Sequence, residues 1–326
     1  MTLTIALDAM GGDNAPDTVV RGALNAHSLG VEIILVGDET EIKSRLDGQG
    51  AKAHHISVVH APTVIGMGDK ALVALRKDKE TSMEVSIRLV AEGKAQGIAT
   101  AGNSGAAVVL ASRHLKRAGL GRPVLGTFLP MGHPPAFLLD VGANTDTTPA
   151  DLVGFAHLGS AFYENWSGEA NPKVGLLNIG GEKGKGDKIT REAYNLLAQE
   201  EGLNFVGNVE GRALGGGVGV HVVVCDGFVG NIILKFAEGF GSAMLRFFGI
   251  ETREALAGKW WAPWLKGTFN APILATRKRV DYAEYGGAPL LGLTGAFFIC
   301  HGSSSAKAIF HAVRRMKIMV ERGLHE

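Results

Sequence analysis

The segment GIATAGNSGAAVVLASRHLKRA, residues 97–118, decides the fold class of this chain. It begins with a short apolar run, residues 97–101, in which polar side chains do not alternate with apolar ones. A strand buried on both faces has this pattern, and such strands are usually parallel. A glycine loop follows at once and leads into a helical pattern over 103–118. The segment therefore predicts one strand–loop–helix unit of a parallel sheet covered by helices.

The same unit recurs along the chain. This recurrence predicts a doubly wound, mostly parallel α/β sheet with helices on both faces, forming a single α/β/α catalytic unit over residues 1–326. A barrel is disfavoured because the spacing of the units is uneven. The apolar runs that meet glycine turns are LTIALD (3–8), VEIILVG (31–37), FLLDVG (137–142), KVGLLNIG (173–180) and HVVVCDG (221–227), and helical patterns cover 17–29, 82–93, 149–165, 187–201, 228–248 and 304–322.

The composition is that of an ordinary globular protein. The 326 residues are 46% hydrophobic and 20% charged, with a formal net charge of +1, which argues against a broad nucleic-acid-binding face. Cys225 and Cys300 lie in apolar runs and cannot form a disulfide framework, which suits a reducing compartment. The N-terminus lacks the basic region of a secretory signal, and no run approaches the roughly 20 apolar residues that span a bilayer. These features predict a cytoplasmic location.

In a doubly wound sheet, ligands bind beyond the carboxyl ends of the strands. The glycine turns fall at these ends, so we expect the polar residues beside them to share one rim. We expect this rim to include Asp8, Asn103, Asn144, Lys185 and Asp226.

Two of these turns lead into helices and are candidate anion sites. In DAMGGDNAP (8–16) we expect Asp8, Gly11 and Gly12 to present a carboxylate and backbone N–H groups to the ligand. In TAGNSGA (100–106) we expect Asn103, Ser104 and Gly105 at a helix N-terminus, where unsatisfied N–H groups favour an anion. The alternative for both turns is ordinary helix capping.

The turn GGEKGKG, residues 180–186, places lysines at the end of a strand. It is not a nucleotide-binding P-loop, because Ile179 stands where the first glycine is required and Gly186 where Ser or Thr is required. What remains is a flexible backbone that contains Lys183 and Lys185. A lysine side chain can bind a phosphate as a point charge. The alternative is a solvated loop without function.

Two later segments supply further polar residues. In HVVVCDGFVGN (221–231), His221 and Asp226 have the HxxxxD spacing of some acyltransferases, but side chains five apart on a strand face opposite ways. Asn231 follows at a helix start and can donate a hydrogen bond. In CHGSSSAKA (300–308), His301 is a candidate rim residue. No residues have metal-ligand or dinucleotide spacing, so we predict no metal and no cofactor, and a nucleophile supplied by the substrate, such as inorganic phosphate.

Residues 253–280 depart from the α/β pattern and hold three of the four tryptophans. The segment is interrupted by proline and glycine and ends in the basic run RKR. We interpret it as an inserted hairpin that contacts either a dimer partner or a membrane surface, with the aromatic side chains in the headgroup layer. The candidate membrane residues are Trp260, Trp261, Trp264 and Leu265.

Taken together, these motifs resemble one family over nearly the whole chain. They occur in order as DAMGGDNAP, TAGNSGA, LLDVGAN, VGLLNIGGEKGKG, FVGNVEGR, VVVCDGFVGN and YGGAPLLG…HGSSSA, between residues 8 and 306. This set resembles the bacterial phosphate acyltransferase of phospholipid synthesis, the acyl-ACP:phosphate transacylase.

The resemblance implies a fold of the isocitrate/isopropylmalate dehydrogenase and phosphotransacetylase group, in a homodimer that associates peripherally with the membrane. The implied reaction converts acyl-ACP and orthophosphate to acyl phosphate, which a membrane glycerol-3-phosphate acyltransferase then uses. By matching the motifs, Lys185 would orient phosphate and Asn231 would stabilise the developing oxyanion. The chain departs from the family pattern at Ser104, Gly181, Asp187 and His221.

The acyl carrier protein is acidic, so the resemblance also implies a basic docking patch. The candidates are Arg277, Lys278 and Arg279, with Arg314, Arg315 and Lys317 on the last helix; the alternative is a solvated charged face. Two other functions stay open: a phosphotransacetylase-like enzyme that uses acyl-CoA, and a non-catalytic membrane scaffold that recruits the carrier protein. A dinucleotide-dependent dehydrogenase is disfavoured, because no glycine fingerprint has a downstream acidic partner.

Overall fold

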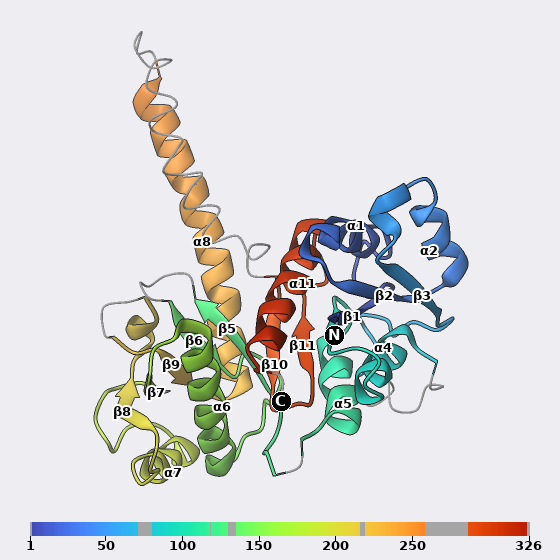
Figure 1. Ribbon diagram of the computed structural model, residues 1–326. Helices are drawn as coiled ribbons and strands as arrows, with labels where there is room; N and C mark the ends of the chain where they lie inside the picture. The colour runs from blue at the N-terminus through green and yellow to red at the C-terminus, as the bar shows by residue number, and fades with distance from the viewer. Residues whose placement is uncertain are drawn as a thin grey trace.

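The computed structural model describes residues 2–70, 80–117, 119–129, 135–215, 219–257 and 286–324. Within these ranges the strands form one eleven-stranded sheet in the order β3-β2-β1-β4-β11-β10-β5-β6-β9-β7-β8. Seven of its ten strand pairings are parallel, so the predicted mostly parallel α/β sheet is confirmed. Figure 1 shows the two halves of this sheet on either side of the central strands.

The sheet consists of two parallel halves joined by an antiparallel centre. One half contains β1 (Thr4–Asp8), β2 (Glu32–Gly37), β3 (Ile56–His60), β4 (Gly97–Thr100) and β11 (Ala296–Ile299). The other contains β6 (Ala136–Leu139), β7 (Lys173–Leu177), β8 (Asn204–Val209) and β9 (Val222–Val224). Between them lie β5 (Val124–Leu129) and β10 (Ala288–Leu291), which pair antiparallel with each other and with their outer neighbours.

This antiparallel centre reverses the direction of the second half. The carboxyl ends of β1, β4 and β11 therefore point along the sheet opposite to those of β6, β7 and β9. The expectation of one shared rim is wrong as stated, because it assumed that all strands run the same way.

Helices cover both faces, which confirms the doubly wound arrangement. The α-helices α1 (Asp17–Asn25), α6 (Pro149–Ser167), α7 (Lys188–Leu197) and α11 (Ala306–Glu321) pack into one hydrophobic core on the first face. On the second face, α4 (Ser82–Ala91) and α5 (Ser104–His114) pack into another core. Alternate residues of β1 belong to the two cores, as expected for a strand buried on both sides: Ile5 and Leu7 to one, Ala6 to the other. The short helices η1 (Ala26–Leu29), α2 (Glu39–Leu46), η2 (Gly50–Ala53) and η3 (Gly211–Gly215) complete the described chain.

The helix α8 (Gly227–Leu256) is longer than the expected helix over 228–248. It begins at the sheet and runs away from it, so that much of its length stands clear of the α/β body (Figure 1). Residues 253–256, expected to open an inserted hairpin, belong to this helix. Residues 258–280 lie outside the described residues, and they include Trp260, Trp261, Trp264, Leu265, Arg277, Lys278 and Arg279.

The apolar character of α8 corrects one expectation. Among the described residues it is the helix that is long and apolar enough to cross a membrane by length and composition alone, with a mean hydropathy of 1.2 over its most apolar window. Lys235 and Glu238 interrupt the apolar side chains, so a search for an uninterrupted run misses it. Only 6% of that window is buried, and Phe236 is 68% exposed.

Candidate functional site

A cavity of about 500 Å³ lies between α8 and the central strands of the sheet. Three of the predicted site residues line it: Ser104 from the start of α5, Asn231 from the second turn of α8, and His301 from the loop after β11. These residues come from both halves of the sheet. The cavity is thus the place where the oppositely directed strand ends meet.

Asn231 reaches this cavity because α8 packs closely on the loop after β6. A side chain at Gly227 would collide with the Asn144 carbonyl, and one at Gly230 would collide with the Asp140 carbonyl. The backbone of Gly142, at φ +131°, lies beside the Asn231 side chain, so that a Cβ built there would be 3.6 Å from it. The glycines of the DGFVGN motif therefore fix the place of Asn231.

Asp140 holds that loop together, and sequence reasoning missed it. Its Oδ1 accepts hydrogen bonds from the backbone N–H groups of Gly142 and Ala143, both at 2.9 Å. Its Oδ2 accepts from the backbone and the side-chain amide of Asn144, at 2.7 and 2.8 Å. Burial raises the pKa of this carboxyl, while the four hydrogen bonds oppose the rise. The LLDVGAN motif contains this residue, but its role appears only once the loop has folded.

On the other half of the sheet, Asp8 braces the loop that leads into α5. Thr100 Oγ1 donates to Asp8 Oδ2 at 2.6 Å and accepts from the Gly102 backbone N–H at 3.0 Å. A Cβ on Gly11 would lie 2.6 Å from Asp8 Oδ2, which is too close, so this position requires glycine. Burial raises the pKa of the Asp8 carboxyl. Asp8, Gly11 and Gly12 do not line the cavity; they shape the backbone that does.

The side chain of Asn103 caps α5. Its Oδ1 accepts from the Ala106 N–H at 3.0 Å, and its Nδ2 donates to the Asp69 carbonyl at 2.8 Å. The first N–H groups of α5, those of Ser104 and Gly105, have no acceptor within their own helix. Ser104 lines the cavity, so this helix presents its positive end there.

The loop after β11 contributes His301 and Ser304. The Ser303 backbone N–H donates to His301 Nδ1 at 3.2 Å, so a neutral ring carries its proton on Nε2 and is a donor from that atom. Ser304 lines the cavity and is 3% exposed, and its hydroxyl has no hydrogen-bond partner among the described residues. A buried hydroxyl without a partner that lines a cavity is a candidate ligand contact, which sequence reasoning did not identify.

Among the described residues, the lysine that lines the cavity is Lys235; Lys185 does not line it. Lys235 lies one turn beyond Asn231 on α8, and its Nζ is 2.9 Å from Glu238 Oε2. Lys185 is exposed in the loop between β7 and α7, where its backbone carbonyl accepts from Asn178 Nδ2 at 3.1 Å. Its strand β7 pairs with β9, which leads into α8, so Lys185 lies at the sheet edge from which Asn231 comes.

Four other residues named from the sequence have structural partners. Asp226 caps α8 by accepting from the Val229 N–H at 2.9 Å, and Asn144 binds Asp140 and the Pro123 carbonyl. Asp187 caps α7 by accepting from Thr190, which lowers the pKa of its carboxyl. His221 stacks on Tyr163 and accepts from the Lys173 N–H, so it forms no pair with Asp226.

Neither cysteine has the properties of a nucleophile. Cys300 lines the cavity, but burial raises the pKa of its thiol to about 12. Burial also raises the pKa of the Cys225 thiol well above its usual range, and its Sγ lies 3.5 Å from the Asp140 carbonyl. Both thiols are therefore neutral near pH 7, whereas the thiolate is the reactive form.

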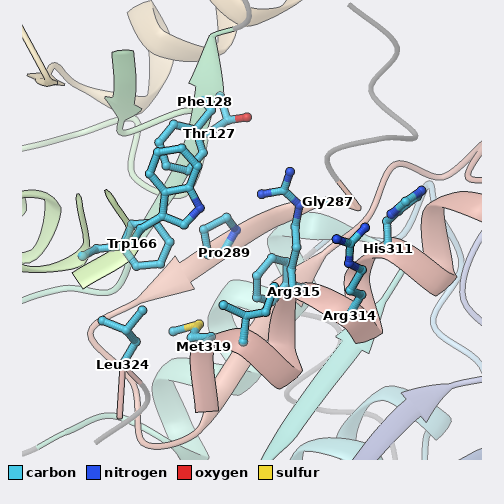
Figure 2. A pocket seen from close by; sticks show the side chains of 13 residues that line it. Thr127, Phe128, Trp166, Gly287, Pro289, His311, Arg314, Arg315, Met319 and Leu324 are labelled. Carbon is cyan, nitrogen blue, oxygen red and sulfur yellow. The ribbon is translucent and has the colours of Figure 1, made fainter. Parts of the chain in front are cut away.

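A second cavity, of about 240 Å³, lies between α6 and α11 and shares Thr127, Phe128 and Gly287 with the lining of the first. Figure 2 shows Arg314, Arg315 and His311 projecting from α11 on one side, with Phe128 and Trp166 on the other. Arg314 is exposed, whereas Lys317 donates to the Leu29 carbonyl. The expected basic residues Arg314 and Arg315 thus line a neighbouring cavity and not the one that contains Asn231.

The polar end of the first cavity is rich in hydrogen-bond donors. Its lining includes the Asn231 amide, the His301 ring, the Ser304 hydroxyl, the start of α5 and Lys235. The remaining walls are mostly apolar and follow α8. Donors of this kind suit an anion or a developing oxyanion, and the apolar walls suit a hydrocarbon group.

The fold is that of the phosphotransacetylases. A EutD phosphotransacetylase from Staphylococcus aureus has a TM-score of 0.61 at 16% sequence identity, covering 98% of this chain and 94% of its own. A phosphotransacetylase from Streptococcus pyogenes also has a TM-score of 0.61, at 18% identity, covering 99% of this chain and 94% of its own. At this identity the likeness establishes the fold alone.

Sequence comparison assigns the family. The chain matches the family described as "Fatty acid synthesis protein" over residues 3–326 and belongs to it. A protein of Desulforamulus reducens named phosphate acyltransferase is 47% identical, over 99% of this chain and 95% of its own. One of Heliobacterium modesticaldum with the same name is 46% identical, over 96% of this chain and 92% of its own. The resemblance seen in the motifs is confirmed, and the protein is an enzyme of this family.

Proposed function

We propose that the protein transfers an acyl group from acyl-ACP to orthophosphate, producing acyl phosphate and free carrier protein. The observation that carries the proposal is the cavity that joins a donor-rich end to apolar walls, in a chain whose relatives are phosphate acyltransferases. The donors would bind the reacting anion, and the apolar walls would hold the acyl group.

In the proposed step a phosphate oxygen forms a bond to the thioester carbonyl carbon. The carbon–sulfur bond breaks, and the departing sulfur takes a proton to become the thiol of the carrier protein. Negative charge develops on the carbonyl oxygen during the attack. No enzyme nucleophile is needed, which agrees with the neutral thiols of Cys225 and Cys300.

Asn231 would donate to the developing oxyanion, because its place on α8 is fixed by the Asp140 loop. His301 and Ser304 would donate to phosphate, together with the N-terminus of α5. Lys185 keeps its proposed role as a countercharge to phosphate, exerted from the loop after β7. A positive charge near the site lowers the electrostatic cost of bringing the phosphate anion into a largely apolar cavity.

The proposed acyl donor is the acyl carrier protein. The exposed Arg314 on α11 supports an acidic carrier protein, since opposite charges speed encounter. The phosphotransacetylase fold favours acyl-CoA as the second candidate donor. The acyl phosphate product is an activated mixed anhydride, which a membrane glycerol-3-phosphate acyltransferase would consume in phospholipid synthesis.

We also propose a homodimer and a peripheral membrane contact of this cytoplasmic enzyme. Val229, Ile232, Phe236, Phe247 and Ile250 form an exposed apolar stripe on α8. Exposed apolar surface of this extent marks a protein or membrane interface. Sedimentation of the purified protein with and without vesicles of anionic phospholipid would separate the two contacts.

The direct test measures acyl phosphate. Purified protein is given palmitoyl-ACP or palmitoyl-CoA with and without phosphate, and the product is trapped as hydroxamate by hydroxylamine. We expect phosphate-dependent product with palmitoyl-ACP. Faster turnover of palmitoyl-CoA would favour the acyl-CoA alternative. Absence of acyl phosphate from both donors would contradict the function and leave the scaffold alternative.

A further inference from the structure

The apolar part of the cavity extends along α8 well beyond the donor-rich end. Leu234, Ala237, Gly241, Met244 and Phe248 line it from this helix. They recur every three or four residues, so they form one stripe on the helix surface. The cavity therefore has an elongated, mostly apolar arm along this helix, which Lys235, Glu238 and Ser242 also line.

This stripe is distinct from the exposed apolar stripe of α8. At 3.6 residues per turn, the mean directions of the two stripes are about 130° apart around the helix axis. Residues 234, 237, 241 and 244 are only partly exposed, whereas Phe236, at 68%, belongs to the other side. One face of α8 thus serves the cavity, and the other is open to a partner or a membrane.

The arm has the length of a long hydrocarbon chain. Ten residues separate Asn231 from Gly241, a distance of about 15 Å along the helix axis, and Phe248 lies about 10 Å further on. The hydrocarbon core of a bilayer is about 30 Å thick, so one leaflet of acyl chains is about 15 Å deep. A membrane-length chain whose carbonyl lies at Asn231 would therefore reach at least Gly241.

We propose that this arm is the binding site of a long acyl chain, and that Gly241 sets the chain length that can be accommodated. The inference rests on the proposed function, because it places the reacting carbonyl at Asn231. Gly241 lines the cavity midway along the arm, and a Cβ built there meets no atom within 4 Å. A chain can pass this point because no side chain projects into it.

The helix offers a matched control in Gly239. A Cβ built on Gly239 also meets no atom within 4 Å, and Gly239 does not line the cavity. The two residues point to opposite sides of α8, since they are two positions apart. Leucine at either position raises helix propensity equally, so Gly241→Leu and Gly239→Leu should be equally well folded. They differ in whether the new side chain enters the arm.

The experiment compares kcat/KM for palmitoyl-ACP and octanoyl-ACP in wild type, Gly241→Leu and Gly239→Leu. We expect Gly241→Leu to lower the palmitoyl-to-octanoyl ratio about tenfold or more, because several methylene groups lose their buried site. The ratio of Gly239→Leu should stay within about twofold of wild type, because its side chain lies outside the cavity. As a second variant, Phe248→Ala should raise turnover of stearoyl-ACP relative to palmitoyl-ACP, because it opens the far end. Thermal melting by circular dichroism checks that each variant is folded.

An unchanged ratio in folded Gly241→Leu, or an equal fall in Gly239→Leu, would overturn the chain-binding site while the proposed function stands. If wild type makes acyl phosphate from neither donor, the proposed function fails and the chain-binding site fails with it. The two failures are therefore distinguishable in one set of assays.

Discussion

Two glycine loops of this protein look alike in sequence and differ in structure. The loop 100–105 is tied down: Thr100 binds Asp8, Gly102 binds Thr100, and Asn103 caps α5. The loop 178–187 is mostly exposed, and Lys185 projects from it without lining the cavity. A glycine turn at the end of a strand therefore predicts only that a site can form there. Buried hydrogen bonds show which of the two loops has a fixed conformation.

The largest effect should come from Asn231, because the hydrogen-bonded Asp140 loop fixes its place much as Asp8 and Thr100 fix the loop 100–105. Replacing Asn231 by alanine should lower kcat about 100- to 1,000-fold, roughly 3–4 kcal/mol of transition-state stabilisation, as expected for loss of an oxyanion donor. The KM for phosphate should change little. Asn165→Ala is the control, because that amide donates to the Ala161 carbonyl within α6. Steady-state hydroxamate assays measure both, and a kcat close to wild type would remove Asn231 from the chemistry.

The Asp140 brace should dominate stability. Asp140→Asn should lower the free energy of unfolding by about 2–3 kcal/mol, because an amide cannot accept all four hydrogen bonds that the carboxylate receives. Asp146→Asn is the control: its side chain is 89% exposed and its ion pair with Arg122 lies at the surface. Urea denaturation followed by circular dichroism measures the two, and equal losses would show that the brace contributes little.

A substitution of Lys185 tests whether the exposed loop 178–187 contributes to phosphate binding. Lys185→Ala should raise the KM for phosphate about tenfold with a smaller change in kcat, as expected for loss of a countercharge that positions the anion. Lys183→Ala, on the same loop, is the control because Lys183 lies over the Tyr194 ring, with Nζ 5.8 Å from its centroid. If both variants keep the phosphate KM of wild type, this loop is a solvated turn and the phosphate site lies in the cavity alone.

The Asp8 brace predicts a pH dependence of stability. Burial raises the folded-state pKa of Asp8 above 3.8, so the stabilising contribution of the neutral carboxyl is present below that pH and is lost as pH rises through the folded pKa. Asp8→Asn does not titrate, so its stability relative to wild type should improve from pH about 4 toward 7. Urea denaturation across this range measures the difference. If the stability of Asp8→Asn relative to wild type falls as the pH rises, the folded protein stabilises Asp8 as the carboxylate.

The smallest effect should come from the basic surface of α11. Arg314→Glu should raise the KM for acyl-ACP a few-fold, because an exposed charge acts mainly on the rate of encounter. It should leave the KM for phosphate unchanged. Lys188→Glu on α7 is the control, an exposed lysine on another helix. The effect should weaken at high ionic strength, and an identical response of the two variants would remove α11 from carrier recognition.

Much of this architecture could be predicted because it is local in sequence. Apolar runs followed by glycine and a helical pattern gave β1, β4, β7 and β9 with the helices after them. The reversal at β5 and β10 could not be predicted, because it arises from pairing between strands far apart in the chain. It is also the reason that the carboxyl ends of the two halves approach each other across the sheet and not along one edge.

The candidate site shows the same limit. Ser104, Asn231 and His301 were predicted from motif position and line the cavity. Asp140, Ser304 and Lys235 were missed, because their roles depend on burial or on the direction of a helix face. Asn103, Asn144 and Asp226 were predicted as ligand contacts, but the structure gives each a capping or bracing hydrogen bond. Polar residues beside glycine turns are often used by the backbone itself.

The most direct test of the central claim asks whether phosphate attacks the thioester without help from an enzyme nucleophile. Wild type is mixed with palmitoyl-ACP in a single turnover, first without and then with phosphate, and intact protein mass and acyl phosphate are followed together. We predict no acylated protein at any time, and acyl phosphate only after phosphate is added. An acyl adduct that forms on the protein without phosphate and disappears when phosphate is added would contradict the account.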